Sequence, residues 1–349
     1  MAKRLALVTV SLLACSGARA PTPSASASNA GPSADRTPPT KSPILLVANK
    51  AEATLSVLEL PAGRVLATLP TGQGPHEIAI APDGTRAVVS NYGDQAALGR
   101  TLTVVDLVGL KIAKTIELGD YRRPHGMAFL DDHRVIVTAE VNASVVIVDL
   151  DAGKVERGIF TSQQGSHMLA RVPGTQRVYV ANIGSGSITP IDVAQGAAGD
   201  SAPAIATSEA IAVTPDGAQV WTASLSENKV VVLDAKLGKL AELPAEGAPI
   251  RVTATPDGKA MLVSNVKGSK LQVVDVATRT VKTIDVPAQQ GDTAAPMGAA
   301  IASDSKTAYV TLVAEDRVAI IDLASGRITG HIAVGHGPDG IAYSSAFAR

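Results

Sequence analysis

The most regular feature of the chain is a pattern of short apolar runs separated by turn signals. Each unit contains a Pro-x-x-apolar-Ala segment, a turn, an apolar run that often ends in Asn, a short polar loop and a Val-x-x-Asp run. In three units the turn is Pro-Asp-Gly, at residues 82–84, 215–217 and 256–258. Pro fixes one backbone dihedral of such a turn and Gly accepts a positive φ. The runs between the turns are short and show no helical period, so they predict β-strands.

The Val-x-x-Asp run occurs seven times, with Glu in place of Asp in the first copy. The copies lie at residues 54–60, 102–107, 144–150, 187–193, 229–234, 271–276 and 317–323. A further strand is expected after each copy, which gives four strands per unit. This repeat predicts an all-β fold, a seven-bladed β-propeller with four antiparallel strands per blade, over residues 43–349.

The two ends of the repeat region predict how the ring closes. The chain enters the first blade at its second strand, residues 44–49, and finishes with a lone first strand at residues 337–342. We therefore expect the C-terminal strand to complete the first blade, which leaves no open seam.

The amino-acid sequence of the repeat resembles that of the YVTN family of seven-bladed propellers. The resemblance rests on Val178-Tyr179-Val180-Ala181-Asn182, on Ala308-Tyr309-Val310-Thr311 and on the Pro-Asp-Gly turns. It covers essentially all of residues 43–349, and it is specific for fold but weak for function. Relatives of this kind include surface-layer proteins, lactonase-like enzymes and the propeller subunits of quinoprotein amine dehydrogenases.

The N-terminal residues predict export. Residues 1–14 have Lys3 and Arg4 followed by a short apolar run, which is typical of a signal peptide. The residues that end at Cys15 resemble a bacterial lipobox, so we expect a periplasmic or cell-surface protein, lipid-anchored at Cys15; cleavage after Ala20 is the alternative. Residues 15–42 are rich in Pro, Ser and Ala and predict a flexible tether. Beyond this lipid anchor we expect no contact with a membrane.

The amino-acid composition excludes several classes of protein. Hydrophobic residues make up 46% of the chain, which excludes overall disorder, and the single cysteine excludes an internal disulfide. Lys and Arg number 31 against 32 Asp and Glu, without a basic block, so nucleic acid is not an expected partner. We expect a monomer that acts on a small-molecule substrate.

Aligned units place one residue per blade just before the innermost strand. In ring order these are His76, His125, His167, Glu209, Ile250, Met297 and Asp339, and ring closure brings the last beside the first. Three imidazoles on neighbouring strands predict a divalent metal site for Cu, Fe or Zn at the channel mouth. Glu209 and Asp339 are expected as further ligands or as carboxylates that fix the imidazole tautomers. The alternative is a polar, solvent-facing rim that binds only water.

Glu140 is a second candidate for catalysis, together with Glu209. It follows His125 by the same interval that separates His76 from Asn91 and His167 from Asn182, so it takes the place of that Asn. It is interpreted as an orienting residue or a general base, with a surface-loop glutamate as the alternative.

Other rim residues bear on the substrate. Arg122 and Arg123 suit an anionic substrate, and His336 is the one remaining histidine expected near the mouth.

Two functions from different classes follow. The first is a metal-dependent envelope enzyme, an oxidase, hydrolase or lyase. The alternative is a non-enzymatic surface propeller that acts as a binding or scaffold module.

Overall fold

The structure is a computed structural model that describes residues 42–289 and 291–345. The predicted signal peptide at 1–14 and all but the last residue of the predicted tether at 15–42, including Cys15 and Ala20, lie outside the described residues. Within the described part of the chain, no helix is long and apolar enough to cross a membrane.

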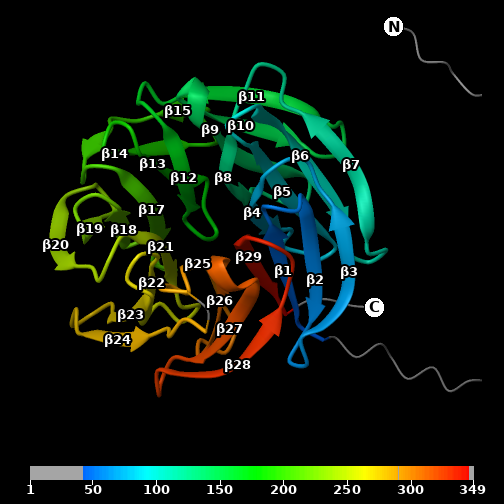
Figure 1. Ribbon diagram of the computed structural model, residues 1–349. Coiled ribbons are helices and arrows are strands. Elements are labelled where there is room, and N and C mark those ends of the chain that lie inside the picture. The colour runs from blue at the N-terminus through cyan, green and yellow to red at the C-terminus, as the bar shows by residue number, and fades with distance from the viewer. Residues whose placement is uncertain (1–41, 290, 346–349) are drawn as a thin grey trace, which may run out of the picture. The chain divides into compact units, whose positions relative to one another are not determined.

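Seven antiparallel β-sheets are arranged as the blades of a propeller around a central channel (Figure 1). The first blade contains β29 (Pro338–Ser344), β1 (Ile44–Asn49), β2 (Thr54–Glu59) and β3 (Arg64–Pro70). The next two contain β4 (Pro75–Ile80), β5 (Arg86–Gly93), β6 (Leu98–Asp106) and β7 (Lys111–Glu117), then β8 (Pro124–Phe129), β9 (Arg134–Ala139), β10 (Ser144–Asp149) and β11 (Lys154–Phe160). The fourth has five strands: β12 (Ser166–Arg171), β13 (Arg177–Asn182), β14 (Ser187–Asp192), and the short β15 (Ala197–Ala198) and β16 (Ala202–Pro203).

The remaining three blades have the plain four-stranded form. They contain β17 (Ser208–Val213), β18 (Gln219–Ser224), β19 (Lys229–Asp234) and β20 (Lys239–Pro244); β21 (Pro249–Ala254), β22 (Ala260–Asn265), β23 (Lys270–Asp275) and β24 (Val281–Asp285); and β25 (Pro296–Ile301), β26 (Thr307–Leu312), β27 (Arg317–Asp322) and β28 (Arg327–Ala333). The helices of the described residues are two single-turn 3₁₀ helices, η1 (Glu140–Asn142) and η2 (Val313–Glu315). The predicted seven-bladed, all-β propeller is confirmed.

The last strand closes the ring as predicted. Antiparallel β29 pairs with β1, with Leu46 opposite Ala342 and Ile44 opposite Ser344. In Figure 1 the red β29 lies beside the blue β1. Strands from opposite ends of the repeat thus share one blade.

The hydrophobic core is divided among the seven interfaces between neighbouring blades. In β1, Ile44 and Leu46 pack toward the second blade, while Leu45 and Val47 pack toward the seventh. Because both faces of a central strand are covered, the sequence reads as continuous apolar runs rather than as alternation. Val, Ile, Leu and Ala supply most of this core, as the low aromatic content predicts.

Each innermost strand starts with a β-bulge that brings its first residues close to the neighbouring blade. The strand register shifts between Pro75 and Ile78 in β4 and between Pro124 and Met127 in β8. A Cβ atom on Gly340 of β29 would lie 1.8 Å from the backbone oxygen of His76. Bulges re-aim side chains, and here they turn the second residue of each strand toward the channel axis.

Candidate metal and charge site at the channel mouth

The seven aligned residues from the sequence all line one small cavity at the channel mouth. Each is the second residue of its innermost strand, the position that follows the first residue of the bulge. The cavity has a volume of about 90 Å³, and Lys50, Met168 and Arg251 complete its lining.

The expectation of a solvent-facing rim is wrong. His125 is 2% exposed, His167 7% and Asp339 3%. The bulges direct these side chains inward, where they line one small cavity. Burial makes their electrostatics strong, because charges attract and repel more in a low-dielectric interior.

The three histidines form a row of tilted rings. The ring centroids of His76 and His125 are 4.0 Å apart, and those of His125 and His167 are also 4.0 Å apart. Among the described residues, the Nδ1 atoms of His76 and His125 are buried and have no hydrogen-bond partner. Buried polar atoms normally have partners, so these two nitrogens mark a place where a ligand can bind.

Both histidines belong to a group of side chains that could hold a metal ion. His76, Glu77 and His125 each offer a ligand atom, and the three atoms all lie within 4.8 Å of one another. Burial lowers the pKa of His125 well below its usual value, and the positive charge of His167 lowers it further. His125 is therefore neutral and keeps the lone pair that a metal requires.

His167 has a different environment from its two neighbours. Its Nδ1 lies 2.8 Å from a Glu140 oxygen and its Nε2 lies 3.1 Å from a Glu209 oxygen. Burial alone would lower the pKa of His167, but the hydrogen bonds to these two carboxylates raise it to about 9. The ring is a cation with a proton on each nitrogen, and in this arrangement it has no free lone pair for a metal. His167 as a metal ligand stays a prediction. The candidate metal-ligand group consists of His76, Glu77 and His125.

The two predicted carboxylate ligands face charged partners. Glu209 faces His167, and an Asp339 oxygen lies 3.0 Å from Lys50 Nζ. The same Asp339 oxygen is 3.6 Å from His76 Nδ1, so it remains close to the metal-ligand group. Neither contact tests whether these residues ligate a metal.

The expectation that Glu140 takes the place of an Asn is wrong by one residue. Asn91 pairs with Pro75, whereas in the third blade it is Ala139 that pairs with Pro124. The turn on the opposite face is one residue shorter there: Leu130 N bonds Arg134 O, where Ala81 N bonds Arg86 O in the second blade. Counting the same number of residues from the histidine in every blade overlooks this one-residue deletion. Glu140 instead matches Lys50 and Tyr92, the residues that follow the Asn of the first two blades.

Glu140 holds the histidine of the neighbouring blade rather than His125 of its own. Its carboxylate accepts a hydrogen bond from the Tyr92 hydroxyl at 3.0 Å as well as from His167. Burial alone would raise the pKa of Glu140, but the hydrogen bond and positive charge of His167, together with Tyr92 and Arg123, outweigh it and the pKa is lowered. Glu140 is an anion that orients and charges His167. A general-base role stays a prediction.

Four residues of the mouth were missed in the sequence: Lys50, Tyr92, Glu77 and Arg251. Glu77 and Arg251 form an ion pair across the channel between the second and sixth blades. Burial alone would raise the pKa of Glu77, but the Arg251 guanidinium and the neighbouring His76 together lower it to about 2. Glu77 and Arg251 directly follow the aligned positions, and Lys50 and Tyr92 share the position of Glu140. Aligning these two further positions across the blades, in addition to the ring position, would have found all four residues.

Other predicted rim residues lie away from the mouth cavity. His336 is exposed and contacts Asp316 and Glu52. Arg122 donates to the backbone oxygen of Gly119 and is also directed away. Arg123 alone reaches the site, through the Tyr92 hydroxyl at 2.8 Å.

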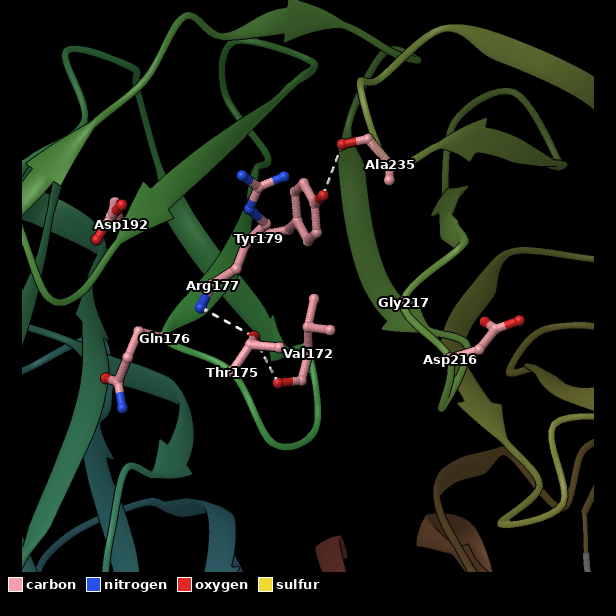
Figure 2. A pocket seen from close by; sticks show the side chains of 9 residues that line it. All are labelled: Val172, Thr175, Gln176, Arg177, Tyr179, Asp192, Asp216, Gly217 and Ala235. Atoms are coloured by element: carbon pink, nitrogen blue, oxygen red, sulfur yellow. Dashed lines mark hydrogen bonds between the residues drawn. The ribbon is translucent and has the colours of Figure 1, made fainter.

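A larger cavity of about 390 Å³ lies on the opposite face, between the fourth and fifth blades. Figure 2 shows Val172, Arg177 and Tyr179 on one side of it and Asp216 and Gly217 on the other. The polar groups are mostly bonded locally: Tyr179 donates to Ala235 O, and Asp216 accepts from Thr214 and from Ala218 N. This cavity has no row of neighbouring histidines or buried ion pair.

The fold defines the class: this is a seven-bladed β-propeller with a buried cluster of charged and imidazole side chains at one mouth. No protein-family model matches the chain, and no curated protein is similar to it in sequence. Among solved structures, it is similar to a functionally unknown protein from Desulfotomaculum acetoxidans DSM 771, with a TM-score of 0.69 and 16% identity. The match covers 86% of this chain and 98% of that chain, and at this identity it shows the fold alone.

Proposed function

We propose that the protein binds a divalent transition metal at the channel mouth, through His76, Glu77 and His125, and uses it in metal-dependent chemistry on a small molecule. The observation that carries this proposal is the pair of buried, unpartnered Nδ1 atoms beside an ionised carboxylate. Two imidazoles and one carboxylate are a ligand set that suits Zn or Fe and leaves positions open. Cu is the third metal to test.

The neighbouring side chains support the same proposal. Arg251 keeps Glu77 ionised, so the carboxylate is ready to bind a cation at any physiological pH. When bound, such a metal lowers the pKa of a coordinated water or polarises a substrate oxygen. His167 carries protons at Nδ1 and Nε2 in the same cavity, held there by Glu140 and Glu209. The cavity therefore combines a place for a Lewis-acidic metal with a protonated histidine, His167.

Metal content is the direct test. The purified chain is analysed for metals as isolated and after reloading with Zn, Fe or Cu, and affinity is measured by calorimetry. His125→Ala should remove most of the binding, because it deletes the ligand at the centre of the row. His133→Ala is the matched control, since His133 is an exposed histidine on the opposite face that contacts Asp151. Wild-type protein that holds no metal, or equal effects of the two changes, would show that the proposal is wrong.

We also propose that the chain is exported and belongs among the YVTN-like propellers. Residues 1–14 and the Cys15 context support export, and the repeat wording supports the family resemblance. Mass spectrometry of the mature N-terminus distinguishes a lipid-modified Cys15 from cleavage after Ala20 and from an uncut chain. A scaffold role remains the competing function, but no contact at the mouth favours it.

A further inference from the structure

A second cavity adjoins the metal-binding mouth on its outer side. It has a volume of about 500 Å³ and is lined by Lys50, Tyr92 and Arg123 together with the loop at residues 93–95. Lys50 lines both this cavity and the mouth. The outer cavity has the size of a small-molecule site, whereas the mouth holds only the end of a molecule or a few waters.

Two cations stand beside one aromatic ring in the outer cavity. Arg123 Cζ is 4.7 Å and Lys50 Nζ is 5.8 Å from the Tyr92 ring centroid. The Tyr92 ring in turn contacts the rings of His76 and His125 edge-on, each with a centroid distance of 5.2 Å. Tyr92 therefore forms the wall between the outer cavity and the proposed metal ligands.

The acidic groups near these cations leave donors for an anion. Lys50 Nζ donates to Asp339 Oδ2 at 3.0 Å, which uses one of the three N–H groups of the ammonium. Asp94 is the acidic residue of the lining, and its Oδ1 accepts hydrogen bonds from the backbone N–H groups of Ala96 and Ala97 in its own turn. Glu140 is 3.9 Å from Arg123, beyond hydrogen-bond distance. Among the described residues, Arg123 Nε is buried without a hydrogen-bond partner. Such a donor is costly to leave unbonded, so it indicates a missing acceptor.

We propose that the outer cavity binds the carboxylate of a small organic acid between Arg123 and Lys50, with the rest of the acid directed past Tyr92 to the metal-binding mouth. This assignment rests on the proposed function, of which it names the substrate class. A planar guanidinium matches a carboxylate, and the tyrosine face offers apolar contact to a carbon skeleton. Lys50 joins the two cavities and places its charge where the bound acid enters the mouth.

The test uses succinate as the probe and inorganic phosphate as the comparison, at constant ionic strength. Calorimetry on zinc-loaded wild type should show saturable succinate binding that is tighter than phosphate binding. Arg123→Gln and Lys50→Met should each weaken it by about tenfold or more, since each removes a charged hydrogen-bond donor. Arg122→Gln is the matched control, because Arg122 lies next in sequence but donates to the Gly119 carbonyl outside the cavity. Thermal melts verify that each variant is folded.

Each outcome decides a separate claim. Succinate binding that survives both Arg123→Gln and Lys50→Met, or that falls equally in Arg122→Gln, overturns the assignment. Tighter binding of phosphate than of succinate would make this a phosphate site and also overturn it. Zinc content is measured in the same samples. Folded protein that holds no zinc but binds succinate through Arg123 and Lys50 would contradict the proposed metal function and leave the anion-binding cavity standing.

Discussion

The two faces of the propeller carry cavities that differ in size and in content. The opposite-face cavity is about 390 Å³ and the mouth cavity about 90 Å³. In the larger one, Tyr179 and Asp216 are bonded to nearby turns. In the smaller one, charged side chains from different blades contact one another, and the Nδ1 atoms of His76 and His125 have no partner within the described residues. Volume does not single out the mouth cavity, because shifted pKa values and unpartnered polar atoms, rather than empty space, mark a place for chemistry.

The strongest test of this contrast compares two arginines. Arg251→Met should destabilise the protein by about 3–5 kcal/mol, because it leaves the Glu77 carboxylate buried without its cation. Arg177→Met, in the opposite-face cavity, should change stability by no more than about 0.5 kcal/mol, since Arg177 is exposed and forms no ion pair among the described residues. Urea denaturation of the metal-free variants measures both.

The double variant Glu77→Leu/Arg251→Met serves as the control for the Arg251 prediction. Removing both charges eliminates the buried unpaired carboxylate, so most of the lost stability should return. A double variant as unstable as Arg251→Met would show that Arg251 acts through packing and not through charge.

The next largest effect concerns the pH dependence of the mouth. The pKa of His167 is raised in the folded state to about 9, so its contribution to stability is complete below its ordinary value of 6.5 and is lost as the pH rises through about 9. The contribution is on the order of 3 kcal/mol. Glu140, Glu209 and His125 are the titratable groups that face this ring. Urea denaturation of metal-free wild type at pH 6 and pH 9.5 should show this loss.

Glu140→Gln separates the His167 contribution from other titrations in that range. It removes one of the two carboxylates that hold the imidazolium, so the variant should lose less stability between the two pH values than wild type. An equal loss in both proteins would place the titrating group elsewhere.

The smallest effect belongs to the turn that borders the opposite-face cavity. Asp216→Ala should cost about 1 kcal/mol, because the Asp216 carboxylate accepts hydrogen bonds from the Thr214 hydroxyl and the Ala218 backbone. Zinc affinity should be unchanged, as the site is on the other face. A weaker zinc affinity in this variant would mean that the two faces are coupled.

The sequence predicted the blades because turn chemistry and apolar runs are local signals. Pro-Asp-Gly at 256–258 and the apolar strand after it need no distant partner to be recognised. The same alignment placed His76 and Asp339 in one ring, since closure follows from counting strands. It failed where a blade departs from the repeat, as at Glu140, because one deleted turn residue shifts the later positions of that blade. The pairing of Glu77 with Arg251 depends on the width of the channel, which no spacing along the chain encodes.

Ring closure by β29 has a consequence for the order in which the protein is made. Lys50 leaves the ribosome long before Asp339, yet their side chains meet at 3.0 Å. His76 of the second blade gains its neighbour Gly340 when the same strand completes the first blade. The mouth cavity, which Asp339 helps to line, therefore cannot be complete before β29 has been made.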